Sequence, residues 1–356
     1  MSRYWSPIVS ALHPYVAGEQ PQGSDVVKLN TNESPFPPSP AVEQALRDFD
    51  SGSLRLYPDP ESTELRQCIA DYHGVGIENV FVGNGSDEVL AHAFYAFFKQ
   101  EAPIIFPDIT YSFYKVYCEL HQIAYELLAL DENYEIPLAS IPADNGGVIF
   151  ANPNAPTGRL LERSDVASML AKIKNSVVLV DEAYIDFAPP ESSAIELVPQ
   201  FDNLLVTRTL SKSRSLAGIR LGYAIGSAAL IEGLIRVKDS FNSYPIDRLA
   251  SALAITSFAD EPFLQACIDD TRSQRSLLVQ SLLKLGYRCL PSEANFVLME
   301  VGDAAAELFA SLRERGVVVR YFDKPRLSQF LRVTIGSEAQ NRRFLDAVTQ
   351  WHEARA

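Results

Sequence analysis

The chain has few of the residues that hold metals or disulfides. Its 356 residues include only four cysteines and five histidines. The cysteines are far apart and form no C-x-x-C pair, and the histidines lack metal-site spacing such as H-x-x-x-H. This scarcity disfavours a metalloenzyme and a disulfide-stapled domain. It predicts reduced thiols in a cytoplasmic protein, at Cys68, Cys118, Cys267 and Cys289.

Positive charge and long apolar runs are also scarce. Lysine and arginine number 31 against 45 aspartates and glutamates, which gives a formal net charge of −14. So acidic a chain is a poor partner for nucleic acids or anionic membranes. No apolar run is long enough to span a bilayer, and Met1–Pro7 lacks the apolar region of a signal peptide. We therefore expect no nucleic-acid partner, no membrane contact and a cytoplasmic location.

The composition instead favours a folded chain of more than one domain. Hydrophobic residues make up 47% of the chain and charged residues 21%, so a full-sized core can form. Between residues 60 and 207, short apolar runs alternate with amphipathic helical stretches, which predicts an α/β domain with a mostly parallel sheet. A helical region over 248–285 precedes expected strands at 296–299, 317–321 and 330–334. This second part indicates a smaller α+β domain.

Polar and glycine-rich segments follow the expected strands, where ligands bind in open α/β sheets. Gly83–Glu88 follows a strand at 80–82 and opens a helix whose free N–H groups suit a phosphate, although a plain capped turn is the alternative. Asn152–Gly158 follows a strand at 147–151 and offers amide donors, although its prolines equally suit an ordinary turn. Neither segment alone identifies a ligand.

Two further strand ends carry charged groups. Asp181–Tyr184 follows an apolar strand, where a carboxylate needs a cationic partner unless it only caps a turn. Thr207–Arg220 follows the next strand and contains Ser211 and Lys212. A lysine partly desolvated among other cations loses its proton more easily and becomes a nucleophile, whereas an isolated Ser-Lys pair is usually a surface feature.

Together, the four strand ends supply a phosphate site, an amide donor, a carboxylate with a phenol, and a lysine. One ligand needs all of these. In pyridoxal phosphate, the phosphate takes helix N–H groups and hydroxyls, and the ring nitrogen takes a carboxylate. Its phenolic oxygen takes a hydrogen-bond donor, and its aldehyde takes a lysine. The combination therefore predicts a pyridoxal-phosphate enzyme.

On these motifs the sequence resembles the fold-type I, class-II pyridoxal-phosphate-dependent aminotransferases and, within them, the histidinol-phosphate aminotransferase family. The resemblance implies a large domain at 29–245 with a mostly parallel seven-stranded sheet flanked by helices. It also implies a small α+β domain at 246–356 and an N-terminal arm at 1–28. The matching pieces run along nearly the whole chain: His13–Tyr15, Leu29–Glu33, Leu56–Pro58, Gly83–Glu88, Asn152–Gly158, Asp181–Tyr184, Thr209–Lys212, Leu216–Arg220, Ser292–Asn295 and Leu331–Gly336.

The resemblance also implies a role at the cofactor for each matching residue. Lys212 would form the Schiff base and move the proton, and Asp181 would pair with the ring nitrogen. Tyr184 would donate to the phenolic oxygen, and Tyr111 would stack on the ring. The phosphate would lie on the amides of Ser86 and Asp87, with Thr209, Ser211 and Arg220.

Substrate contacts are implied in the same way. Arg332 would clamp the carboxylate of glutamate or 2-oxoglutarate with two hydrogen bonds. Tyr15, Asn32 and Arg320 would contact the second substrate, with Arg320 at its phosphate. Tyr57 would reach the cofactor phosphate of a neighbouring subunit, which implies a homodimer with shared sites. The implied reaction, a step of histidine biosynthesis, converts L-histidinol phosphate and 2-oxoglutarate to imidazole-acetol phosphate and glutamate.

One position departs from the family pattern. The family often carries Asn-Asn-Pro-Thr-Gly, and its second Asn bonds the phenolic oxygen, but this chain has Ala155 at that position. We expect Asn154 to take over that contact. The alternatives are Asn152, or Tyr184 acting alone.

Other functions are compatible with parts of the pattern. An aromatic or broad-range aminotransferase, or a threonine-phosphate decarboxylase, would keep every cofactor contact. A regulatory protein with an aminotransferase-like domain would add a DNA-binding segment, for which the chain has no basic stretch. A Rossmann dehydrogenase is disfavoured, because no G-x-G-x-x-G opens a helix.

Overall fold

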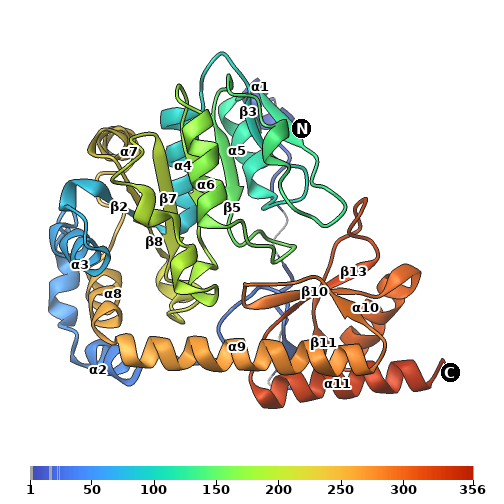
Figure 1. Cartoon of the computed structure of the whole chain (residues 1–356). Helices are drawn as coiled ribbons and strands as arrows, with labels where there is room; N and C mark the ends of the chain where they lie inside the picture. Colours follow the sequence, from blue (N-terminus) through green and yellow to red (C-terminus); the bar gives the residue numbers. More distant parts are fainter. Residues whose placement is uncertain (1–2, 16–17, 22, 24, 356) are drawn as a thin grey trace.

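A seven-stranded sheet dominates the computed structural model, which describes residues 3–15, 18–21, 23 and 25–355 (Figure 1). Its strands are β2 (Val80–Asn84), β3 (Ile104–Pro107), β4 (Tyr125–Leu128), β5 (Val148–Ala151), β6 (Val178–Asp181), β7 (Leu204–Thr209) and β8 (Leu221–Gly226). They lie in the order β2-β8-β7-β6-β5-β3-β4. Neighbours from β7 to β4 are parallel, whereas β8 is antiparallel to both β2 and β7. The expected mostly parallel sheet is confirmed.

Helices cover both faces of this sheet (Figure 1). On β6, Val178 and Val180 face one apolar core and Leu179 faces the other, as expected for a strand buried on both sides. The helices that precede the C-terminal part are α1 (Pro7–Ala11), α2 (Pro40–Asp48), α3 (Thr63–His73), α4 (Gly85–Phe97), α5 (Phe113–His121), α6 (Arg163–Lys172), α7 (Ala228–Phe241) and α8 (Arg248–Ala259). The first core includes residues of α2, α3, α6 and α8, and the second core includes residues of α4, α5 and α7.

The C-terminal part builds a second, antiparallel sheet with its own core. The strands are β9 (Arg288–Cys289), β10 (Phe296–Glu300), β12 (Arg320–Tyr321) and β13 (Phe330–Thr334), in the order β12-β13-β10-β9. Its helices are α9 (Glu261–Lys284), α10 (Ala305–Glu314) and α11 (Glu338–Glu353). Separately, β1 (Val27–Lys28) pairs in parallel with β11 (Val317–Val318), so the end of the expected arm belongs to this core. Short 3-10 helices connect the elements at Ser51–Arg55, Ile77–Asn79, Leu138–Ser140, Ile185–Phe187, Pro190–Ser192, Ala194–Leu197, Ala217–Ile219 and Gly302–Ala304.

Three details differ from the sequence-based expectation. The single strand expected at 317–321 is two short strands, β11 and β12, which belong to different sheets. The helical region expected over 248–285 is two helices, because α8 ends at Ala259 and Pro262 lies in the first turn of α9, where its missing N–H costs nothing. Strand β8 was not expected, since Gly222 and Gly226 weaken strand propensity. Gly222 is required there, because a Cβ would lie 2.2 Å from the backbone nitrogen of Ser86.

Some features that would indicate other classes of protein are not found in the described part of the chain. No helix there is long and apolar enough to cross a membrane. No cluster of His, Cys, Asp and Glu among those residues could hold a metal ion. All four cysteines are free thiols.

Candidate active site

Lys212, Asp181 and Tyr184 come from neighbouring strand ends. Asp181 is the last residue of β6, and Lys212 follows β7, which pairs with β6 in parallel, so both ends lie at one edge of the sheet. Lys212 Nζ lies 5.7 Å from the centre of the Tyr184 ring and donates to the Thr31 carbonyl at 3.1 Å. The structure therefore brings the lysine and the phenol together.

Asp181 is a buried carboxylate without a cation beside it. Its side chain accepts hydrogen bonds from Tyr114 Oη at 2.9 Å and from the Ala183 N–H at 3.2 Å. Burial raises the pKa of Asp181 to about 6, and the hydrogen bonds only partly offset this. Among the described residues no lysine, arginine or histidine forms an ion pair with it. The arrangement suits a positively charged ligand group.

The start of α4 is open to an anion. Asn84 precedes the helix, but its side chain makes no capping hydrogen bond. The Asn84 side chain therefore does not accept from the first-turn N–H groups of Ser86 and Asp87. Arg220 Nη2 reaches the same turn and pairs with Asp87 Oδ2 at 3.2 Å, while Tyr111 Oη donates to Asp87 Oδ1 at 2.9 Å. Gly85 makes room, because a Cβ would lie 2.6 Å from Arg220 Nη2.

Two buried hydroxyls lie beside that helix start. Thr209 Oγ1 donates to Ser211 Oγ at 3.0 Å and accepts the Ser211 N–H at 3.2 Å. Thr209 is the register partner of Gly222 on β8, and Gly222 packs against the backbone of Ser86. The residues expected at the phosphate from the same chain thus lie around the first turn of α4.

Asn154 is engaged within its own loop. Its Nδ2 donates to the Ile109 carbonyl at 2.9 Å and to Thr157 Oγ1 at 3.0 Å, which uses both amide hydrogens. Its Oδ1 accepts from Thr110 Oγ1 at 2.9 Å. A contact with a cofactor would require Asn154 to give up one of these bonds, so the expected role of Asn154 stays a prediction and Tyr184 is the freer donor.

Arg332 and Arg320 lie side by side on adjacent strands. They are register partners on β13 and β12, where two like charges repel unless an anion joins them. Arg332 Nη2 donates to the Asn30 carbonyl at 2.8 Å, and its buried Nε has no partner among the described residues. Burial lowers the pKa of Arg332. A carboxylate or phosphate would satisfy both side chains.

Tyr15 and Tyr57 occupy different places. The Tyr15 ring lies 4.7 Å from that of Phe113, and Tyr15 is near enough to Arg332 and Tyr111 to affect the pKa of both groups in its own chain. Tyr57 is 78% exposed and stacks on Tyr244 at 4.7 Å. Its contact with a neighbouring subunit stays a prediction.

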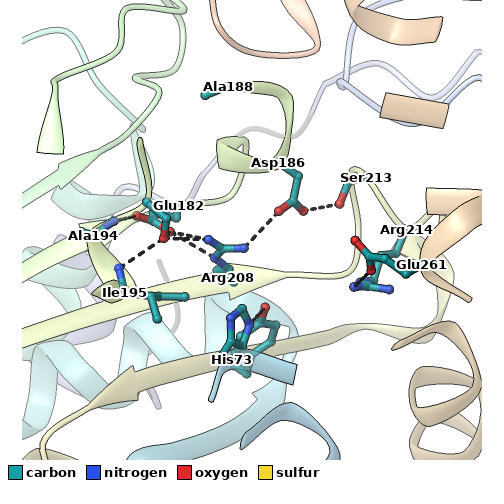
Figure 2. Close-up of polar contacts among 12 residues, drawn as sticks. His73, Glu182, Asp186, Ala188, Ala194, Ile195, Arg208, Ser213, Arg214 and Glu261 are labelled. Carbon is teal, nitrogen blue, oxygen red and sulfur yellow. Dashed lines mark hydrogen bonds and ion pairs between the residues drawn. The ribbon is translucent and has the colours of Figure 1, made fainter. Parts of the chain in front are cut away.

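A network of ion pairs and hydrogen bonds around Arg208 includes Glu182, Asp186 and Ser213 (Figure 2). Arg208 Nε donates to Glu182 Oε2 at 3.0 Å, and its Nη1 donates to Asp186 Oδ1 at 3.0 Å. Ser193 Oγ also donates to Glu182, and Ser213, the residue after Lys212, donates to Asp186. Glu182, next to Asp181, and Asp186, two residues after Tyr184, are therefore both paired with Arg208, and Ser213, next to Lys212, joins them through Asp186.

Removing this arginine should destabilise the protein. Arg208→Met leaves the buried Glu182 carboxylate without its cation, so we expect unfolding free energy to fall by about 3–5 kcal/mol in chemical denaturation. Arg236→Met is the matched control, because the Arg236–Glu232 pair is exposed and contributes about 0.5 kcal/mol or less. Equal losses in the two variants would contradict the role of the network.

Three contributors to the site were not expected from the sequence. Tyr114 donates to Asp181, Thr334 bonds Asn32, and the Glu33 carboxylate lies near Lys212. Lys28 donates to Glu33 at 2.5 and 2.6 Å, and this ion pair helps to lower the pKa of Glu33 against the effect of burial. Glu33 and Thr334 lie within the matching segments Leu29–Glu33 and Leu331–Gly336, and Tyr114 lies three residues after Tyr111, but none of them had a role predicted from the sequence.

Comparison with known proteins identifies the family. The family model "Aminotransferase class I and II" matches residues 24–348. A histidinol-phosphate aminotransferase of Chromohalobacter salexigens is 53% identical over 350 residues, covering 98% of this chain and 99% of that protein. One from Methylococcus capsulatus is 54% identical over 351 residues, with 98% of each chain covered. The chain belongs to the histidinol-phosphate aminotransferases of aminotransferase class I and II.

Solved structures agree on the fold. The histidinol-phosphate aminotransferase of Sinorhizobium meliloti, solved with pyridoxal-5'-phosphate, has a TM-score of 0.89 at 24% identity. The match covers 100% of this chain and 99% of that protein's chain. An L-threonine-O-3-phosphate decarboxylase of Porphyromonas gingivalis also matches, with a TM-score of 0.81 at 21% identity, over 92% of this chain and 100% of its own. The expected fold-type I architecture is confirmed, and the fold alone does not separate these activities.

The residues present fit pyridoxal phosphate. Asp181 is buried and lacks the cation that a protonated ring nitrogen would supply. The uncapped start of α4, flanked by Arg220 and two hydroxyls, suits a phosphate. Lys212 lies at the same sheet edge, and its amine makes only one hydrogen bond in the described part of the chain, to a carbonyl.

Proposed function

We propose that this chain transfers the amino group of L-histidinol phosphate to 2-oxoglutarate, with pyridoxal phosphate as cofactor. The products are imidazole-acetol phosphate and glutamate, as expected for an enzyme of histidine biosynthesis. The observation that carries the substrate assignment is the pair Arg320 and Arg332, two adjacent cations with no acidic partner among the described residues. Full-length identity of 53% to histidinol-phosphate aminotransferases supports it.

Lys212 and Asp181 carry the chemistry. When bound, pyridoxal phosphate supplies an electron-accepting ring that stabilises negative charge at the substrate α-carbon. Lys212 would hold the cofactor through its Nζ, and the same amine would serve as the base and acid that moves the substrate α-carbon proton. Asp181 keeps the ring nitrogen protonated. Tyr184 donates to the phenolic oxygen.

The other residues position the two ligands. Tyr111 stacks on the ring, and Ser86, Asp87, Thr209, Ser211 and Arg220 hold the cofactor phosphate. Arg332 clamps the carboxylate of glutamate or 2-oxoglutarate, and Arg320 binds the phosphate of histidinol phosphate. Tyr15 lines the second-substrate side. The expected substrate contact of Asn32 stays a prediction, because its buried amide already bonds Tyr184 and Thr334.

A cytoplasmic homodimer with shared sites is part of the proposal. Large exposed apolar side chains lie on the segment that carries Tyr57 and at and after the end of α7, where a second copy would cover them. The exposed side chains are Leu54, Leu56, Tyr57, Phe241 and Tyr244.

Donor preference tests the proposed function. We expect kcat/KM for L-histidinol phosphate to exceed that for L-phenylalanine by about 100-fold or more, because charge-assisted bonds to a phosphate contribute about 1.5–3 kcal/mol each. A preference for phenylalanine would make the protein an aromatic aminotransferase. Release of CO2 from O-phosphothreonine would make it a decarboxylase.

Arg332→Gln tests the carboxylate clamp. The change removes two charge-assisted hydrogen bonds, so KM for 2-oxoglutarate should rise about 100-fold or more, while the absorbance band of the bound cofactor stays in place. Arg288→Gln is a matched control, because Arg288 is exposed on β9 of the same sheet. An unchanged KM in Arg332→Gln would remove this residue from the substrate site.

A further inference from the structure

Tyr184 is held by a chain of hydrogen bonds that starts in the C-terminal sheet. Asn32 is only 1% exposed, and its Nδ2 donates to Tyr184 Oη at 3.1 Å. Thr334, on β13, donates its hydroxyl hydrogen to Asn32 Oδ1 at 2.9 Å and accepts the Asn32 backbone N–H at 3.0 Å. Asn295 Nδ2 donates to the Asn32 carbonyl at 3.0 Å. Asn32 is thus fixed on three sides.

This series of hydrogen bonds determines how the Asn32 amide and the Tyr184 hydroxyl are oriented. Because the Thr334 hydroxyl gives its hydrogen to Asn32 Oδ1, the NH2 side of the Asn32 amide faces Tyr184. An amide N–H can only donate, so the Tyr184 oxygen accepts that bond and its own hydrogen points elsewhere. No acceptor for that hydrogen is found among the described residues.

The loop around Ala155 offers no easy replacement for Tyr184. Ala155 has no side-chain donor, and both amide hydrogens of Asn154 are donated to protein acceptors. Asn152 is 1% exposed and is held by Leu161 on both sides of its amide, at 2.9 and 2.8 Å. The Tyr184 hydroxyl is therefore the donor left for a ligand oxygen at this place.

We propose that Asn32 and Thr334 are positioning residues that aim the Tyr184 hydroxyl hydrogen at the phenolic oxygen of pyridoxal phosphate. The proposal rests on the proposed function only for its cofactor. Without a hydrogen bond from Tyr184, the phenolic oxygen keeps more negative charge. It then holds more firmly the proton on the nearby nitrogen that joins the cofactor to Lys212, and this proton is lost at a higher pH.

Other titratable groups also face this point, and all of them stay unchanged in the variants below. Lys28 and Glu33 lie beside Lys212 on the N-terminal side, and Asp181 comes from β6. Those on the remaining sides are Arg320, Arg332, Tyr15 and Tyr111. A shift in the pH midpoint between variants therefore reports the change at Tyr184.

The test is a pH titration of the cofactor absorbance band in the purified holoenzyme. Tyr184→Phe should raise the midpoint by about one pH unit, since one hydrogen bond to a charged group is lost. Thr334→Val should raise it by about half a unit, and Thr334→Ser, which keeps the hydroxyl, should leave it near the wild-type value. In the Tyr184→Phe background, Thr334→Val should add nothing.

Thr271→Val is the matched control, because Thr271 is 3% exposed and its hydroxyl bonds the Cys267 carbonyl within α9. It should leave the midpoint unchanged. The proposal is wrong if Thr334→Val moves the midpoint equally with and without the Tyr184 hydroxyl, or does not move it. A wild-type protein without a cofactor band would overturn the proposed function and this inference together. A normal band with no response to histidinol phosphate would overturn only the substrate assignment.

Discussion

Lys212→Ala is expected to lower kcat by about 10⁴-fold or more, because the change removes both the amine that holds the cofactor and the group that moves the proton. The fold should survive, since Lys212 Nζ makes only one hydrogen bond in the described part of the chain, to the Thr31 carbonyl. Single-turnover rates and thermal unfolding, measured on the same preparation, separate loss of chemistry from loss of structure.

Lys174→Ala provides the control for this experiment. Lys174 is an exposed lysine whose ammonium lies 5.9 Å from the centre of the Phe201 ring, away from the strand ends of the site. Its removal should leave kcat within about twofold of the wild type. If Lys212→Ala kept a comparable rate, the chemistry would have to be assigned to another residue.

Asp181→Asn should be nearly as damaging to turnover. The substitution keeps the shape of the side chain but removes the negative charge that holds the ring nitrogen in its protonated form. We expect kcat to fall by about 10²–10⁴-fold and the affinity for pyridoxal phosphate to fall with it. Near-normal kcat in Asp181→Asn would show that the ring nitrogen does not depend on this carboxylate.

The same substitution should have the opposite effect on the cofactor-free protein. The pKa of Asp181 is raised from 3.8 to about 6 by burial, so the folded protein binds more protons than the unfolded chain between these values. The contribution of Asp181 to stability is therefore present below pH 4 and is lost as the pH rises through 6. Cofactor-free Asp181→Asn should be about 2–3 kcal/mol more stable than the wild type at pH 7.

Denaturant titrations of both cofactor-free proteins at pH 5 and pH 7 check this expectation. The difference in unfolding free energy should grow with pH and should shrink or reverse when pyridoxal phosphate is added, because the cofactor supplies the missing cation. A constant difference across this pH range would mean that Asp181 does not titrate there.

Strand-end reasoning from the sequence predicts much of the candidate site. Asp181 and Lys212 lie where parallel strands β6 and β7 end, and the physical rule that ligands bind at such ends depends only on order along the chain. The Gly83–Glu88 turn was found in the same way, since a glycine-rich turn before a helix is a local feature, whereas the phosphate role of Thr209, Ser211 and Arg220 came from the family resemblance. The resemblance to a known family added Arg320 and Arg332.

Contacts between residues far apart in the sequence could not be predicted from the sequence. Tyr114 is 67 positions from the carboxylate it bonds, and Thr334 is 302 positions from Asn32. Asn154 shows the same limit in a local motif, because its residue type suggests a free amide donor while its neighbours already use both hydrogens. Hydrogen-bond satisfaction depends on geometry, which periodicity and composition do not encode.

The absorbance of the purified holoenzyme, followed during a single half-reaction, tests the proposed cofactor and the proposed substrate in one experiment. L-histidinol phosphate, L-glutamate and L-phenylalanine are added separately, and the band of the Lys212-bound cofactor is followed as it converts to the amine form. We expect histidinol phosphate to convert the band at a far lower concentration than phenylalanine. Glutamate should also convert it to the amine form, by the reverse of the half-reaction with 2-oxoglutarate. Conversion that is best with phenylalanine, or no band at all after pyridoxal phosphate is added, would contradict the proposed function.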